Sequence, residues 1–131
     1  MEHLYVKEGT IADPDFSEQY LQWSAKFEVN SFPATSGSNA TYNMQAINRF
    51  GIVDEATYPY EINQWDETND PECDGEDEQP TRCYTNGHPS DEVQAAQKYT
   101  LPRGRWLHPR DIKSHMQQEE TGAIVGLTFF Y

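Results

Sequence analysis

The sequence has few basic residues and only two cysteines. Of its 131 residues, 9 are Lys or Arg and 22 are Asp or Glu, so the formal net charge is −13 at pH 7. A field of this sign repels phosphate groups, which argues against nucleic acid and against an anionic membrane surface as partners. No apolar run approaches the roughly 18 residues that span a bilayer. The residues after Met1 lack the basic and apolar parts of a signal peptide.

Several signatures of catalysis and metal binding are also missing. The chain contains no G-x-S-x-G elbow, no H-E-x-x-H pair, no C-x-x-C pair and no Gly-rich phosphate loop. His108 and His115 are seven residues apart and could share a helix face, but surface histidines are the better interpretation. The residues alone therefore predict no complete catalytic site, no metal site and no cofactor.

Both cysteines lie in a long polar segment, residues 62–92, which we call the acidic tract. The tract is longer than most structureless connections, so we expect it to be functional or cross-linked. Its negative charge should raise the pKa of a thiol and disfavour the thiolate. We therefore expect a disulfide between Cys73 and Cys83 rather than a nucleophilic cysteine.

The acidic tract also contains the first half of a calcium-loop pattern. Asp70, Glu72 and Asp74 alternate and are followed by Gly75, as in positions 1, 3, 5 and 6 of an EF-hand loop. Position 12 should be a bidentate Glu and is Thr81, and no clear helix leads into Asp70. A solvated acidic loop without metal is the preferred interpretation.

Apolar spacing and cap residues predict four helical segments. One ends before Gly9, one begins after Ser17, one runs from Ser38 or Asn39 to Gly51, and one begins at Pro109. Strands are expected near residues 98–100 and 105–107 and over "GAIVGLTFFY" at the end of the sequence. The first and last elements stop abruptly, so we expect a chain truncated at both ends.

Three blocks of the sequence resemble the middle part of a papain-like (cathepsin-type) cysteine peptidase. "DFSEQYLQWS" is similar to the family's "LSEQxLxDC" helix, and "SGSNATYNMQAINRFGIVDEATYPYE" to its "GCxGGxxxxAxxYxxxxGIxxExxYPY" segment. "DIKSHMQQEETGAIVGLTFF" is similar to a later helix and strand. The resemblance covers nearly the whole chain, and the Tyr-Pro-Tyr unit after a Gly-ended helix is its most specific part.

The resemblance implies an α+β fold of the papain type. Residues 1–95 would be a portion of the helical left lobe, with the acidic tract as an insertion, and residues 96–131 would begin the β-rich right lobe. Pro59 would fix an extended path there, with Tyr58 and Tyr60 anchored by burial. Met44 and Ile47 of the third helix would be buried against the second helix.

The resemblance also implies a function, peptide-bond hydrolysis by a Cys–His pair in the full-length protein. The family blocks that carry Cys, His, Asn and the oxyanion-hole Gln are missing here, so no residue is assigned a catalytic role. The expected substrate-binding residues are Gly37 and Ser38 in the turn that pairs with an extended polypeptide, with Ala40 and Leu127 walling a side-chain pocket.

The chain also departs from the family. Residues near Thr35 and at Ser24 replace two family cysteines, so Cys73–Cys83 would be a local substitute for the usual disulfides. For the full-length protein we expect a secreted or periplasmic location, where disulfides persist. The alternatives are a non-catalytic binding module whose acidic tract takes calcium or a basic partner, and a catalytically dead homologue.

Overall fold

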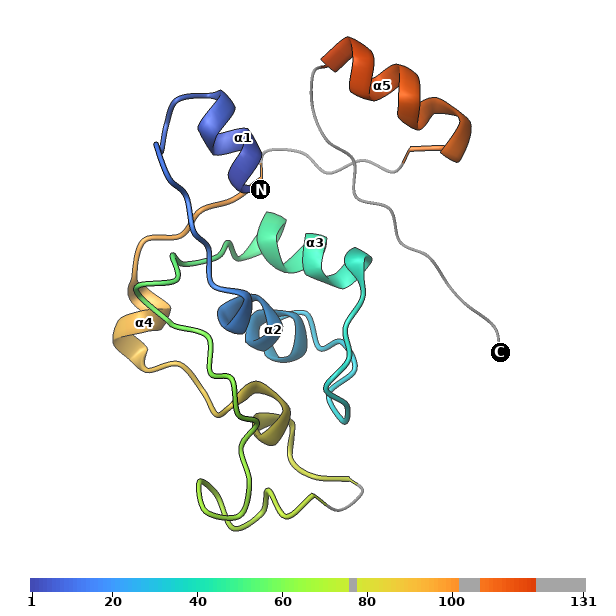
Figure 1. Ribbon diagram of the computed structural model, residues 1–131. Helices are drawn as coiled ribbons and strands as arrows, with labels where there is room; N and C mark the ends of the chain where they lie inside the picture. Colours follow the sequence, from blue (N-terminus) through green and yellow to red (C-terminus); the bar gives the residue numbers. More distant parts are fainter. Residues whose placement is uncertain (76–77, 102–106, 120–131) are drawn as a thin grey trace. The chain divides into compact units, whose positions relative to one another are not determined.

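The computed structural model describes residues 1–75, 78–101 and 107–119 and divides the chain into two compact units. One unit joins residues 1–14 to residues 103–131, and the other comprises residues 15–102. No helix among the described residues has the length and apolar character to cross a bilayer. The larger unit holds the candidate site and can be followed in Figure 1 by its colours, from blue near residue 15 to orange near residue 101.

The smaller unit contains two helices among its described residues. α1, Glu2–Lys7, ends before Gly9, whose φ of +67° is the left-handed conformation expected after a helix. A 3₁₀ turn, η2, spans Pro109–Asp111 and leads into α5, Ile112–Glu119. Pro109 occupies the first helical turn after His108, whose Nδ1 accepts from Arg110 N–H at 3.3 Å. Both predicted helices are therefore confirmed.

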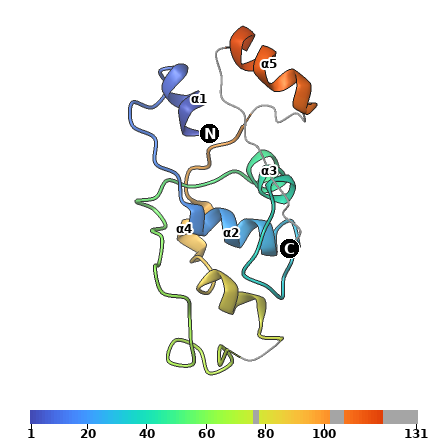
Figure 2. The ribbon, with the colours of Figure 1, turned by 45° about the vertical axis from the view of Figure 1, so that its right-hand side comes forward.

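Two ten-residue helices form the core of the larger unit. α2, Glu18–Phe27, is capped by Ser17, and α3, Ala40–Arg49, is capped by Asn39, as the cap residues predicted. The two helices pack on each other and lie side by side in both ribbon views (Figures 1 and 2). Ile47 and Ala46 of α3 are buried, whereas Met44 is only half-buried, so the expected burial of Met44 is wrong.

The chain leaves α3 through Gly51 along an extended path. Gly51 has a φ of +81°, and a Cβ there would stand 2.7 Å from Cβ of Lys98, so no larger residue fits. Ile52 and Tyr99 form an isolated antiparallel bridge, and Phe16 and Asp54 form another. The strand expected at residues 98–100 is therefore wrong, because a single bridged residue takes its place.

The acidic tract then runs away from the two helices and returns through short helical turns (Figure 1). The 3₁₀ helix η1, Thr81–Thr85, packs on α2, and α4, Asp91–Ala95, follows with Ser90 as its cap. α4 was not expected from the sequence. The predicted strand over residues 123–130 lies outside the described residues, and so does most of the strand predicted at 105–107. The α+β fold and the lobe boundary after residue 95 stay predictions.

Candidate functional site

The N-terminal end of α2 holds the extended segment that contains the Tyr-Pro-Tyr unit. Ser17 is fully buried; its Oγ accepts from Tyr20 N–H at 3.0 Å and donates to the carbonyl of Tyr58 at 2.5 Å. The rings of Tyr20 and Tyr58 meet edge to face with centroids 6.2 Å apart. One cap residue therefore starts the helix and fixes a segment 41 residues later in the chain.

Burial in this cluster changes the acidity of both phenols. Desolvation, with a smaller contribution from Glu28, raises the pKa of Tyr20 to about 12. Desolvation and Glu61 also raise the pKa of Tyr58. The expectation that both rings of the Tyr-Pro-Tyr unit are anchored by burial is half right. Tyr58 is half-buried, whereas Tyr60 is 54 % exposed.

Two glutamines of α2 fasten the acidic tract to the helix. Gln19 donates from Nε2 to the carbonyl of Thr85 at 2.8 Å, and its Oε1 accepts from Glu61 N–H at 3.4 Å. Gln22 donates from Nε2 to the carbonyl of Tyr84 at 2.7 Å and to that of Ser36 at 3.2 Å. The two hydrogen bonds of Gln22 place the tract next to the turn that begins at Ser36.

This turn contains two of the predicted substrate-binding residues, Gly37 and Ser38. Gly37 N–H donates to Thr35 Oγ1 at 3.0 Å, and its carbonyl accepts from Lys26 Nζ at 2.9 Å. Ser38 Oγ donates to Asn43 Oδ1, while its backbone N–H and carbonyl have no hydrogen-bond partner among the described residues. Ser38 has a negative φ, the condition under which serine can replace glycine in such a turn.

The other two predicted substrate-binding residues have different outcomes. Ala40 is the first residue of α3 and is exposed directly after the turn. Leu127 lies outside the described residues, so the pocket expected between it and Ala40 stays a prediction. A surface hollow of about 330 Å³, which was not predicted from the sequence, lies between the turn and the tract. Its lining comes from α2, the turn, the Tyr-Pro-Tyr unit and the tract and includes Gln22, Ser36, Tyr60 and Tyr84.

The two cysteines form the predicted disulfide. The Cys73–Cys83 bond has an S–S distance of 2.09 Å and a Cα–Cα distance of 5.3 Å, and both residues are buried. Neither sulfur is a thiol in this state, so neither can serve as a nucleophile. The chain's own cysteines thus have a cross-linking role within the acidic tract.

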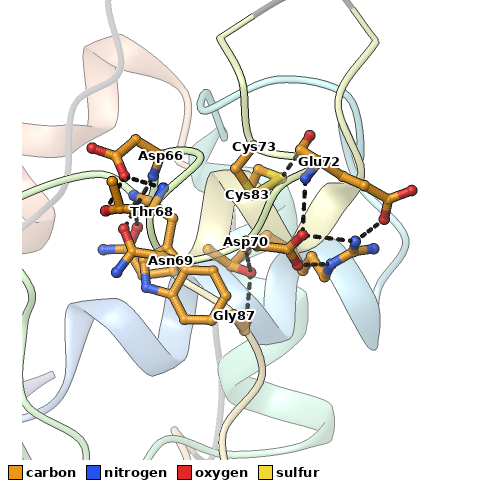
Figure 3. The surroundings of a disulfide bond; sticks show 12 residues. Asp66, Thr68, Asn69, Asp70, Glu72, Cys73, Cys83 and Gly87 are labelled. Atoms are coloured by element: carbon orange, nitrogen blue, oxygen red, sulfur yellow. Dashed lines mark hydrogen bonds and ion pairs between the residues drawn. A yellow bond between two sulfur atoms is a disulfide. The ribbon is translucent and has the colours of Figure 1, made fainter.

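The side chain of Arg82 contacts the residues with which the calcium-loop pattern begins. Arg82 Nε lies 2.6 Å from Asp70 Oδ2, and its Nη2 contacts Glu72 Oε2 (Figure 3). Asp70 Oδ1 also accepts from Glu72 N–H at 3.0 Å. Among residues 1–75, 78–101 and 107–119, no three His, Cys, Asp or Glu side chains gather closely enough to hold a metal ion. The guanidinium group of Arg82 thus pairs with two of the three carboxylates in the calcium-loop pattern.

Comparison with known proteins finds no matching family, no matching curated protein and no matching solved structure.

Proposed function

We propose that this chain is the central part of a papain-like cysteine peptidase that hydrolyses polypeptides in its full-length form. The observation that carries the proposal is the contact between Ser17 and Tyr58. These residues belong to the two blocks with the most specific resemblance, the "SEQ" helix and the Tyr-Pro-Tyr segment. Their direct contact is what one structural unit containing both blocks would require.

A second observation concerns the substrate. Peptidases that bind extended substrates pair them through the backbone, as an added β-strand does. Such pairing needs an exposed N–H and carbonyl that have no intramolecular partner. Ser38 offers both groups among the described residues, at the position where the resemblance places the substrate-binding turn. The chain would supply this turn, and residues outside it would supply the thiolate and the imidazole.

The calcium-binding alternative gains no support, because the carboxylates of Asp70 and Glu72 pair with Arg82. Two protein forms test the peptidase proposal. One is the present chain, and the other is a longer protein expressed with the flanking coding sequence on both sides. The longer form should react stoichiometrically with an epoxide inhibitor of cysteine peptidases and cleave peptides. The present chain, whose two cysteines are joined, should do neither.

A pair of variants in the longer protein tests the turn itself. Ser38→Pro removes the backbone N–H and should raise KM for peptides at least about tenfold, while Ser38→Ala keeps the backbone groups and serves as the control. A longer protein that contains no epoxide-reactive cysteine would contradict the proposal. Equal KM values for the two variants would mean that the turn is not part of the substrate site.

A further inference from the structure

A buried lysine of α2, which has no acidic partner among the described residues, donates hydrogen bonds to the loop that precedes α3. Lys26 lies in the last turn of α2 and is 1 % exposed. Its ammonium group donates to the carbonyl of Phe32 at 3.0 Å, to that of Gly37 at 2.9 Å and to that of Thr35. Among the described residues, no carboxylate pairs with it. A chain of net charge −13 thus places one of its nine basic side chains on backbone carbonyls alone.

The backbone of residues 30–39, which we call the Lys26 loop, explains why three carbonyls converge. Asn30 and Phe32 both have positive φ, 60° and 48°, and such residues turn the chain back on itself. Carbonyls that face inward in an irregular loop need donors, and an ammonium group offers three. Burial lowers the pKa of Lys26. Hydrogen bonds to carbonyl oxygens in general favour the charged form of an amine.

The hydrogen bonds of the loop divide its backbone into an inner and an outer part. Both backbone groups of Gly37 have partners: the N–H donates to Thr35 Oγ1 inside the loop, and the carbonyl accepts from Lys26 Nζ of α2. The next residue, Ser38, has neither group engaged among the described residues, and Asn39 then caps α3. The free backbone edge therefore begins one residue after the last carbonyl that Lys26 holds.

We infer that Lys26 is a positioning residue, whose ammonium group fixes the carbonyls of residues 32, 35 and 37 so that the backbone of Ser38 faces an incoming extended peptide. The inference rests on the proposed function for the identity of the ligand. It assigns a specific task to a side chain that touches no substrate. The papain-like family has a cysteine near the position of Thr35. In this chain the ammonium group of Lys26 would hold the loop in place of that cysteine's disulfide.

The test compares Lys26→Met, which keeps most of the aliphatic stem, with Lys26→Arg, which keeps the charge. Lys113→Met, at an exposed position of α5, is the matched control. The readouts are amide hydrogen exchange along the whole chain and a titration of the Ser38 amide signal. The titrant is a blocked tetrapeptide of alternating alanine and valine, which favours an extended backbone.

Lys26→Met should speed exchange at Gly37 at least about tenfold and weaken peptide binding at Ser38 at least about fivefold. Amides within α2 and α3 should keep their protection. Lys26→Arg should recover part of the affinity, because a planar guanidinium cannot reach all three carbonyls at once. Lys113→Met should match the unsubstituted protein.

Unchanged exchange at Gly37 in Lys26→Met would overturn the inference, and so would an equal loss of protection in α2 and α3. If the unsubstituted protein shows no peptide-induced shift at Ser38, the proposed function fails, and the exchange data still decide whether Lys26 holds the loop. If Lys26→Met does not fold, acetylation of the unsubstituted protein decides. Lys26 should react at least about tenfold more slowly than Lys113, and equal rates would contradict the inference.

Discussion

Two segments attached to the same helix are held in opposite ways. The Lys26 loop, residues 30–39, is fastened from outside by a single ammonium group on three backbone carbonyls. The acidic tract is joined to α2 by Gln19 and Gln22, but it also carries its own cross-links, a disulfide and the ion pairs of Arg82 with Asp70 and Glu72. Both are irregular, and both lie in a chain with few cations.

The difference follows from what each segment contains. The Lys26 loop has no acidic side chain, so the groups available to a cation are its carbonyls. The acidic tract has many carboxylates, whose mutual repulsion must be offset before the chain can return to α2. Gln22 touches both segments, through Ser36 and Tyr84. The segments therefore share the hydrogen bonds of Gln22, while the Lys26 ammonium group and the disulfide act on one segment each.

Removal of the disulfide should produce the largest change. A closed loop of ten residues contributes about 3 kcal/mol on the chain-entropy model, so Cys73→Ala with Cys83→Ala should lower the free energy of unfolding by this order. Urea unfolding measures the loss. Amide exchange should rise in the acidic tract and stay unchanged at Gly37. Equal increases in both segments would show that their fastenings are not separate.

A glycine pair tests packing inside the tract. Gly87 and Gly75 have nearly equal φ values, +86° and +83°, but a Cβ at Gly87 would stand 2.4 Å from the Trp65 ring, whereas nothing lies within 4 Å at Gly75. Gly75→Ala should cost about 1 kcal/mol from the left-handed backbone alone. Gly87→Ala should cost about 2 kcal/mol because the Trp65 ring must also move. Urea unfolding followed by tryptophan fluorescence gives both values, and equal costs would mean that the ring does not pack on Gly87.

Local signals explain what the sequence could predict. Ser17 and Asn39 cap their helices, and Gly51 and Gly9 follow helices with positive φ, because these conformations depend on one or two residues. The disulfide was predictable because the chain offers a single pairing. α4 was missed since a five-residue helix with one half-buried apolar side chain shows no periodicity, although Ser90 is a cap signal.

Long-range contacts were not predictable from the residues. The role of Lys26 depends on positive φ at Asn30 and Phe32, residues with side chains that do not require that conformation. The pairing of Arg82 with Asp70 spans 12 residues of a tract without periodicity. The exposure of Tyr60 likewise depends on the path that the chain takes from Tyr58 into the acidic tract. These features all follow from tertiary placement, which the pattern of residue types does not determine.

The smallest expected effect concerns the ionic fastening of the acidic tract. The guanidinium of Arg82, together with Glu72 N–H, holds the pKa of Asp70 below its ordinary value. A carboxyl group with a lowered pKa in the folded state binds fewer protons than in the unfolded state. Its contribution to stability is therefore present above the unfolded pKa near 3.8 and is lost as the pH falls through the folded pKa.

Arg82→Gln should therefore raise the titration midpoint of the Asp70 carboxyl toward its ordinary value and flatten the loss of stability below pH 4. Carbon NMR of the carboxyl signal from pH 6 to pH 2 measures the midpoint. Arg110→Gln is the control, because Arg110 is exposed and pairs weakly with Asp111 at 3.6 Å. An Asp70 midpoint that is identical in the two variants would mean that Arg82 does not hold the pKa of Asp70 below its ordinary value. The carboxylates of Asp70 and Glu72 would then be open to a metal ion.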